Sequence, residues 1–509
     1  MKIKTNFLFI LILLIGIALR IYNLGKYNFW WDEILSIEIA KAMTFWNIAY
    51  FGYATASPLF YLLLRFWLHL GNSEFILRLL PFIFGVLSIP TIYLVGKELF
   101  DKKVGLISAF ILAISPFHIY YSQELRTYSL VTFLALITIY YLVRILKKNK
   151  IFYWVGFITS TMLILYSHNI ALFLMITVNC YFLLFYKKYK ILWRNWLISQ
   201  FIILLLYLPW VKIIFVQIWY AKALGCFQGI PTDYLTNFIQ IFRIFNLGYN
   251  AKEITHLLII LLFLPLFLFG IWDEEKKEEI YLLLCWLFIP IIMLTIFSNL
   301  MFPLYLVRVL IYISPAYYII IAYGVSRLKL NKIYLYFFLF FSILVGFSLK
   351  NHYLNIFPLP ELPYRVGVHP RKEFKLASDY INQNYQKGDI IGHTSEATHL
   401  PFLYYHKKKL EETIFVSGHQ NLDINHLKLH LFYFKILKEK KILPININIP
   451  VNIETIKRNS YKRIWLVFSS WENNQTDLAL ENIKKYLEKN FIIVKTKEFL
   501  GITIYLYQI

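Results

Sequence analysis

Charged side chains occur in this sequence at the edges of apolar runs, where a membrane surface would lie. Asp32 and Glu33 are adjacent in "YNFWWDEILSIEIA", directly after the first apolar run. Gln123, Glu124 and Arg126 stand in "SPFHIYYSQELRTYSL", where another apolar run begins. An ionisable group at or within a bilayer is costly and is a functional candidate by default. Carboxylates can take a proton from an attacking hydroxyl, and arginines can hold a phosphate.

Further polar residues are predicted at the same depth, near the outer surface of the membrane. His168 lies in the turn "YSHN" between two apolar runs, and Arg308 lies more than one helical turn inside "MFPLYLVRVLIYISPAYY". Arg65 and His69 are four residues apart in "SPLFYLLLRFWLHLG", so they share one helical face. A buried arginine needs an anion, and beside lipid the obvious anion is a lipid phosphate.

A structural interpretation exists for each of these groups. The acids at 32–33 could be solvated, or could cap a helix that begins there. Glu124 and Arg126 could form an interfacial salt bridge, which would add little stability. His168 could be an interfacial hydrogen-bonding group, and Arg308 could extend toward the interface. The gathering of all of them at one level favours a shared outer cavity.

One reaction uses carboxylates and a phosphate-binding arginine beside lipid, namely transfer of a sugar from a lipid phosphate. A carboxylate removes the proton from an acceptor hydroxyl as that hydroxyl attacks the anomeric carbon. A cation stabilises the charge that grows on the departing lipid phosphate. The lipid-linked donor would enter the cavity from the bilayer, and the acceptor would enter it from the water.

The rest of the chain predicts the membrane helices that must position these groups. Of the 509 residues, 59% are hydrophobic and 16% are charged, whereas a soluble chain is typically about 25% charged. Apolar runs long enough to cross a hydrocarbon core recur along the sequence. We therefore predict a polytopic α-helical membrane protein with about eleven spans. The predicted spans are 6–23, 75–96, 104–119, 127–145, 151–167, 169–186, 195–214, 255–272, 280–298, 303–325 and 331–349.

Lysine and arginine gather in the short loops between these spans. With the N-terminus inside, four of the five inner loops are basic, as the positive-inside rule requires. The segment 57–71 is too short to span and would invert every later loop, so we predict an amphipathic helix on the outer surface. The first run has no small-residue cleavage site, so we interpret it as a span and not as a signal peptide.

The net charge of +23 does not indicate nucleic acid, because these loops explain it and no basic helix or reader motif appears. The three cysteines, Cys180, Cys226 and Cys285, are far apart and predict neither a disulfide framework nor a zinc site.

The tail differs from the rest in composition, with more Lys, Asn and Glu and with shorter apolar runs. Helical patterns at 372–385 and 477–490 alternate with strand-like runs at 388–394, 463–470, 491–497 and 502–509. This alternation predicts a small α/β domain. The predicted division is a membrane domain at 1–350 and an extracytoplasmic α/β domain at 351–509.

The run from 56 to 130, with "ASPLFYLLLRFWLHLG" and "SQELRTYSL", resembles the protein O-mannosyltransferase and aminoarabinose transferase relatives within the GT-C glycosyltransferases. The pair Asp32–Glu33 is similar to the acidic pair of that family's first outer loop, whose aspartate is taken as the catalytic base. Glu124 falls where the family has its second outer-loop acid, and "YSHN" is similar to a recurrent Thr/Ser-His turn. The late span reads Arg308-Val309, where the family often has Arg-Tyr.

The resemblance implies a GT-C-like integral membrane glycosyltransferase that uses a sugar linked to a polyprenyl or dolichyl phosphate. Transfer would invert the configuration at the anomeric carbon. Transfer would occur on the outer face of the cytoplasmic membrane, or in an equivalent lumen, to a lipid, glycan or protein. "WWD" at 30–32 lies in the first loop, so we do not equate it with the tail motif of oligosaccharyltransferases.

On this basis we assign roles to individual residues. Asp32 is the predicted general base, and Glu33 and Glu124 orient the acceptor. A divalent metal is compatible with these acids, and the sequence establishes no cofactor. Arg126 and Arg308 are predicted to hold the donor phosphate. The other predicted substrate-binding residues are Gln123, His168 in the cavity wall, and Arg65 on the surface helix.

Three other functions remain as alternatives. A transporter or flippase would show charges at span midpoints and broken segments in corresponding halves, and neither pattern appears. A polymerase or ligase for lipid-linked glycans would use the same chemistry with another donor. A non-catalytic scaffold, whose tail binds a partner, would keep its function when the acids are changed to amides.

Overall fold

The structure is a computed structural model, and it divides the chain into two compact units. Unit 1 comprises Met1–Leu24, Phe45–Gly71 and Phe75–Leu359, and unit 2 comprises Gly25–Thr44, Asn72–Glu74 and Pro360–Ile509. The second unit therefore includes part of the first loop, in addition to the tail that composition separates. The structure describes residues 5–42, 57–223, 233–302, 304–328, 331–359, 368, 370–393, 396–406, 410–416, 451–452, 461–469 and 474–509. Cys226 lies outside the described residues.

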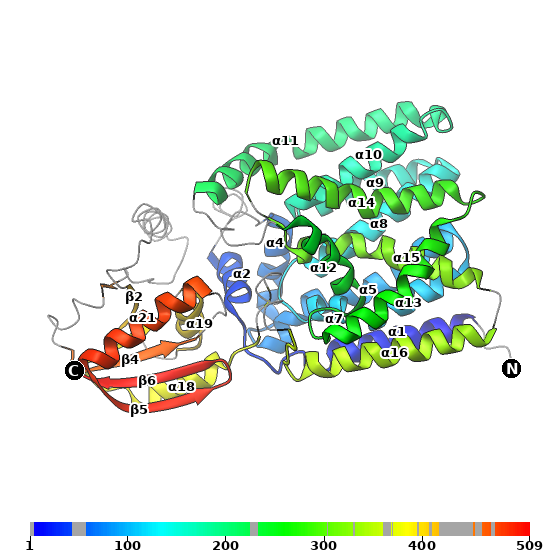
Figure 1. The fold of residues 1–509 in the computed structure, drawn as a ribbon. Coiled ribbons are helices and arrows are strands. Elements are labelled where there is room, and N and C mark those ends of the chain that lie inside the picture. Colours follow the sequence, from blue (N-terminus) through cyan, green and yellow to red (C-terminus); the bar gives the residue numbers. More distant parts are fainter. Residues whose placement is uncertain are drawn as a thin grey trace. The chain divides into compact units, whose positions relative to one another are not determined.

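Unit 1 consists of helices, most of which run alongside one another (Figure 1). Its α-helices are α1 (Thr5–Ile21), α4 (Pro58–Trp67), α5 (Glu74–Leu99), α6 (Lys102–Ile114), α7 (Pro116–Ser122), α8 (Tyr128–Lys148), α9 (Ile151–Leu165), α10 (Leu172–Leu184), α11 (Trp193–Ala223), α12 (Tyr234–Leu247), α13 (Glu253–Ile271), α14 (Lys277–Leu300), α15 (Ser314–Arg327) and α16 (Asn331–Tyr353). Its 3₁₀ helices are η1 (Leu68–Leu70), η2 (Asn169–Ala171), η3 (Lys190–Leu192) and η4 (Val307–Ile313).

Several of these helices have the length and composition of membrane spans. Among the described residues, six helices are long and apolar enough to cross a bilayer, or seven if the bent pair α6–α7 counts as one span. The segments Thr5–Ile21, Ile151–Leu165 and Asn169–Leu184 are apolar but shorter. The helix Pro58–Leu70 is also short, as predicted for a segment that does not span.

Two predicted spans are not continuous α-helices. The span predicted at 104–119 is bent by 60° between α6 and α7, because Pro116 follows Ser115 and cannot donate to the helix before it. The span predicted at 303–325 begins as the 3₁₀ segment η4 and becomes α-helical only at Ser314. Arg308 therefore lies in a 3₁₀ segment and not inside an α-helix.

Small residues bring the helices of unit 1 into close contact. A Cβ at Gly324 in α15 would lie 2.0 Å from the carbonyl oxygen of Leu266 in α13, and a Cβ at Gly270 would lie 2.4 Å from that of Ile320. The absence of side chains at both positions lets the two backbones touch, as is common between membrane helices.

Unit 2 is built on a six-stranded sheet with the order β3-β2-β1-β4-β6-β5. The strands β3, β2, β1 and β4 are parallel neighbours, and β6 pairs antiparallel with β4 and β5. The strands are β1 (Asp389–His393), β2 (Glu412–Val416), β3 (Val451–Asn452), β4 (Arg463–Phe468), β5 (Ile492–Phe499) and β6 (Ile502–Gln508). The helices are α2 (Trp31–Ala42), α18 (Phe374–Asn384), α19 (Glu396–Tyr405) and α21 (Asn474–Asn490).

Alternating side chains of this sheet form two cores, one on each face. Ile391 and Trp465 face a core that includes Phe374 of α18 and Phe402 of α19. Their neighbours Ile390 and Ile464 face the opposite core, which includes Ile483 and Leu487 of α21. The predicted α/β tail is therefore a sheet covered by helices on both faces.

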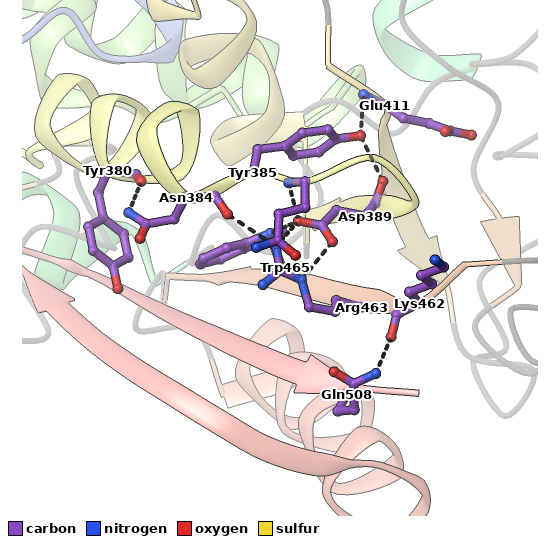
Figure 2. A network of polar contacts seen from close by, with 10 residues as sticks. Tyr380, Asn384, Tyr385, Asp389, Glu411, Lys462, Arg463, Trp465 and Gln508 are labelled. Atoms are coloured by element: carbon purple, nitrogen blue, oxygen red, sulfur yellow. Dashed lines mark hydrogen bonds and ion pairs between the residues drawn. The ribbon is translucent and has the colours of Figure 1, made fainter.

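A buried ion pair joins the two central strands of this sheet. Asp389 Oδ1 and Oδ2 accept hydrogen bonds from Nε and Nη2 of Arg463, at 2.7 and 2.6 Å, and Oδ2 also accepts from the Trp465 indole at 2.8 Å. Figure 2 shows these donors converging on the one carboxylate. Although burial opposes ionisation, these hydrogen bonds and the positive charge of Arg463 lower the pKa of Asp389. This acid is committed to the fold and needs no functional explanation.

Candidate functional site

The junction between α7 and α8 carries the second predicted acid. The α7 helix ends at Ser122 and α8 begins at Tyr128, and the backbone N–H of Arg126 donates to the Glu124 carbonyl at 2.7 Å within the turn. Because the backbone is not helical here, Glu124 and Arg126 are not held to opposite helical faces. Glu124 is buried and Arg126 is half-buried.

The turn that carries His168 is fastened to this junction. Thr127 Oγ1 donates to the carbonyl of Ser167 at 3.1 Å. His168 caps η2 by accepting a hydrogen bond at Nδ1 from the Ile170 N–H at 3.2 Å, and its side chain is buried. Its ring lies 6.2 Å from that of Tyr128, measured between centroids.

Arg308 of η4 reaches the same aromatic ring. Its guanidinium carbon lies 6.0 Å from the centroid of the Tyr128 ring, within the range of a cation–π interaction. Burial, together with the weaker effect of the positive charges of Arg126 and Arg308, lowers the pKa of His168 to about 3. The imidazole is therefore neutral at physiological pH, and both guanidinium groups act on it electrostatically.

These contacts bring four of the predicted site residues into one part of unit 1. We call this group the Tyr128 cluster, and it combines one acid, one neutral imidazole and two guanidinium groups from three segments distant in sequence. Two guanidinium groups placed in this way can hold a phosphate, and the acid can orient a hydroxyl. The Tyr128 cluster consists of Glu124, Arg126, Tyr128, His168 and Arg308.

Two buried tyrosines next to the cluster were not predicted. The hydroxyls of Tyr121 and Tyr249 are 2.7 Å apart, and the charges of Glu124 and Arg308 act on both. Tyr249 stands in "LGYN" after α12, and this motif does not indicate a functional site by itself. Its position beside the α7–α8 junction depends on tertiary packing.

The other two predicted binding residues of unit 1 have different surroundings. Gln123 donates its amide hydrogens to the carbonyls of Arg20 and Tyr22, at 2.9 and 2.8 Å, and its Oε1 accepts from His352 at 2.9 Å. Gln123 thus fastens the end of α1 and the end of α16 to the junction. Arg65 is exposed in the last turn of α4.

A further buried arginine, Arg20, has a structural role that sequence analysis missed. Its side chain donates to the carbonyls of Ala113 and Leu112, at 2.7 and 2.9 Å, and to that of Gly16 at 3.1 Å. Ala113 and Leu112 are in the last turn of α6, where carbonyl groups lack partners within the helix. The cation therefore compensates the break between α6 and α7. The signal was an arginine inside the first apolar run.

The predicted acidic pair lies in unit 2, in the first turn of α2. Glu33 Oε2 accepts from the backbone N–H of Trp30 at 3.3 Å, as in a capping box, and from Arg371 at 2.8 Å. Its side chain is completely buried. The structural interpretation of a helix-capping acid thus applies to Glu33, whose partner Arg371 comes from a distant part of the chain.

Asp32 precedes Glu33 and is also buried, with 9% of its surface exposed. Its backbone carbonyl accepts a hydrogen bond from Ser36 Oγ at 2.8 Å, which belongs to the α2 helix itself. Adjacent positions on a helix point in different directions, so Asp32 and Glu33 do not share one environment.

The comparison with known families matches the membrane part of the chain. A family model described as dolichyl-phosphate-mannose-protein mannosyltransferase matches residues 55–213, which include the α4 helix, the α7–α8 junction and the His168 turn. Asp32 and Arg308 lie outside the matched stretch. No curated protein matches the sequence.

Solved structures match over nearly the whole chain at low identity. ArnT from Cupriavidus metallidurans in the apo state has a TM-score of 0.59 and 12% identity, covering 98% of this chain and 97% of ArnT. The same protein bound to undecaprenyl phosphate has a TM-score of 0.57 and 11% identity, with coverages of 99% and 98%. The archaeal oligosaccharyltransferase AglB from Archaeoglobus fulgidus, in complex with an inhibitory peptide and a dolichol-phosphate, has a TM-score of 0.51 and 14% identity, with coverages of 91% and 69%.

At this identity the solved structures establish the fold, and the family match adds a sequence pattern that covers two of the three segments of the Tyr128 cluster. The chain is a multi-pass membrane protein that resembles the GT-C glycosyltransferases, in particular the protein mannosyltransferases and ArnT.

Proposed function

We propose that this protein is an inverting glycosyltransferase that moves a sugar from a polyprenyl or dolichyl phosphate to an acceptor hydroxyl. The observation that carries the proposal is the Tyr128 cluster, where Arg126 and Arg308 act on one buried imidazole beside Glu124. Two guanidinium groups acting on one imidazole make this part of unit 1 positively charged, and arginine binds phosphate oxygens in a bidentate manner.

The donor's phosphate is assigned to Arg126 and Arg308. As the glycosidic bond breaks, its electron pair goes to the phosphate oxygen, and the two cations stabilise the resulting negative charge. The lipid phosphate is the leaving group and the first product. Undecaprenyl phosphate and dolichol-phosphate are the lipids named for the ArnT and AglB complexes, and both ligands suit this assignment.

The acceptor's proton is assigned to Asp32. The acceptor oxygen attacks the anomeric carbon from the side opposite to the phosphate, and therefore the anomeric configuration inverts. Asp32 takes the hydroxyl proton during this attack. Glu124 orients the acceptor.

The sequence predicted an acceptor contact for Glu33 and substrate binding for Gln123. We now assign both to holding the backbone. Glu33 accepts from Trp30 and Arg371, and Gln123 donates to two carbonyl groups. Arg65, exposed on α4, is assigned to an early contact with either substrate.

The proposed location is the cytoplasmic membrane, with the N-terminus inside and the α/β domain outside. The basic loops between predicted spans support this orientation. The donor would enter from the outer leaflet, and the acceptor would be a lipid, a glycan or a protein.

The test uses the full chain in lipid nanodiscs with polyprenyl phosphates that carry radiolabelled sugars. Release of the lipid phosphate and transfer of label are measured for wild type, Arg308→Gln and Arg126→Gln. We expect turnover by wild type and a loss of about 10²–10³-fold in each variant, the usual effect of removing one stabiliser of developing charge. The matched control is Arg327→Gln, at the other end of α15, where Arg327 donates to the carbonyls of Phe269 and Trp272.

Equal turnover in Arg308→Gln and wild type would refute the phosphate assignment. Movement of intact labelled donor across the bilayer, without release of lipid phosphate, would favour a flippase. Activity only with diphosphate-linked glycans would favour a ligase.

A further inference from the structure

A cluster of histidines and one buried glutamate lies in unit 2, and none of its members has a role in the proposed reaction. One ligand atom from each of His393, His399 and Glu412 lies within 4.8 Å of the other two. All three side chains are almost completely buried, with exposed fractions of 0%, 1% and 2%. His406 adds a third imidazole, which donates from Nδ1 to Glu412 Oε1.

The fold of the β1–α19–β2 segment brings these residues together. His393 is the last residue of β1, and Glu412 is the first residue of β2, paired with Ile391 in the parallel register. Since side chains two apart share a face, His393 and Glu412 both point to the face that α19 covers. His399 and His406 are seven positions apart along α19 and just beyond it, so they share the side that also carries Phe402.

Three ring nitrogens of this cluster have no hydrogen-bond partner among the residues that the structure describes. They are Nδ1 of His393, Nε2 of His399 and Nε2 of His406. Buried polar atoms without partners are rare in folded proteins, and a group of them in one place indicates a missing ligand. The rings of His393 and His399 lie 4.9 Å apart, measured between centroids.

We propose that His393, His399 and Glu412 bind a divalent transition metal ion, with Zn²⁺ as the best fit, and that His406 fixes the carboxylate. Two imidazoles and one carboxylate form a donor set typical of zinc, whereas Mg²⁺ and Ca²⁺ select oxygen ligands. A histidine that bonds the second oxygen of a ligating carboxylate orients it and strengthens binding. These three ligands leave the fourth position of a tetrahedral zinc site to a water molecule.

The ion would join the neighbouring strands β1 and β2 to the helix α19 that covers them. The other side of α19 supports α2, since the backbone N–H of Phe29 donates to Tyr405 Oη at 2.8 Å and the rings of Phe29 and Tyr404 lie 6.0 Å apart. Metal removal should therefore loosen α19 and with it the segment that precedes α2.

The experiment uses the full chain in detergent, purified through a tag that contains no histidine, then stripped with a chelator and titrated with Co²⁺ alone. We expect one Co²⁺ per chain, with the visible absorption of a tetrahedral site, and displacement by Zn²⁺. His399→Gln and Glu412→Gln should abolish stoichiometric binding, and His406→Gln should weaken it about 10–100-fold. The matched control His69→Gln replaces an exposed histidine and should bind as wild type does.

Two further samples separate this site from the proposed catalytic residues. Asp32→Asn and Glu124→Gln should keep the Co²⁺ spectrum, and its loss in either of them would overturn the proposal. So would an absence of binding by wild type, or unchanged binding by His399→Gln. If a variant misfolds, X-ray absorption of the zinc-loaded wild type decides, because only nitrogen and oxygen ligands with two imidazoles fit this cluster.

Discussion

The start of α2 and the junction before α8 look alike in sequence but differ in structure. Each has an acid beside aromatic residues just where a helix begins, at Glu33 and at Glu124. Glu33 lies inside the first turn, where it accepts from the Trp30 N–H and from Arg371. Glu124 lies before the helix, in a turn that the backbone bond from Arg126 to Glu124 closes, and its charge acts on Tyr121 and Tyr249.

The difference shows that the role of an acid near the start of a helix depends on whether it lies inside the first turn or before it. The first residue of the helix must therefore be known before the acid is interpreted. An acid in the first turn is favoured by the helix dipole and by free N–H groups, so the helix itself explains it. An acid in the preceding turn receives no such benefit. The four predictions below test this distinction.

The largest expected effect separates the two adjacent acids. Asp32→Asn should reduce kcat about 10²–10⁴-fold, because it removes the proposed general base. Glu33→Gln should reduce kcat far less, because Glu33 stabilises α2 and does not touch the substrate. Release of lipid phosphate at saturating donor measures both. A larger loss in Glu33→Gln than in Asp32→Asn would reverse the two assignments.

The next effect concerns the acid before α8. Glu124→Gln should lower kcat/KM for the acceptor about 10²-fold, because a misplaced acceptor reacts slowly. The control Glu98→Gln changes an acid at the far end of α5 that pairs with Arg144 at 2.7 Å, and it should leave kcat/KM unchanged. If the two variants behave alike, Glu124 is an anchoring residue like Glu98.

A stability measurement sharpens the interpretation of Glu33. Glu33→Gln and Arg371→Gln should each destabilise unit 2 by about 1–3 kcal/mol, because each leaves a buried partner without its charge-assisted hydrogen bond. The double variant should lose less than the sum of the two. Thermal unfolding in detergent measures the losses, with Glu481→Gln in the exposed pair Lys485–Glu481 as the neutral control. Additive losses would mean that the ion pair contributes nothing.

The smallest effect is a pH dependence of stability from the His168 turn. The pKa of His168 is about 3 in the folded protein and about 6.5 in an unfolded chain, so the unfolded chain binds the proton first as the pH falls. The stability is complete above pH 6.5, and about 1 kcal/mol should be lost between pH 6.5 and 5.5 from this group. His168→Gln should reduce that slope in thermal unfolding. An unchanged slope would place the titrating group elsewhere.

Most of the helices and strands could be predicted, because their signals are local. Long apolar runs gave the helices of unit 1, and alternation of short runs gave β1, β4, β5 and β6. The bend at Pro116 and the 3₁₀ start before Ser314 were missed, because hydropathy does not register how the backbone hydrogen bonds are arranged.

The site could be predicted in part. Glu124, Arg126, His168 and Arg308 were each visible as polar residues at the edges of apolar runs. The sequence could not predict which residues contact one another. Arg371, which pairs with Glu33, is 338 positions away, and Tyr249, which bonds Tyr121, is 128 positions away. Arg20 was missed for the same reason, because its partners are carbonyl groups of another helix.

The division of unit 2 along the chain has a consequence for biosynthesis. The α2 helix is made near the start of translation, but α19, on which its preceding segment rests, follows roughly 350 residues later. At about 5–20 residues per second, the segment waits about 20–70 s for its partner. During that interval the apolar side chains of Phe29, Ile34 and Ile37, which are completely buried in the finished protein, must be sheltered by the bilayer surface or by a chaperone. A premature stop codon before α19 would therefore remove the support of a segment near the beginning of the protein as well.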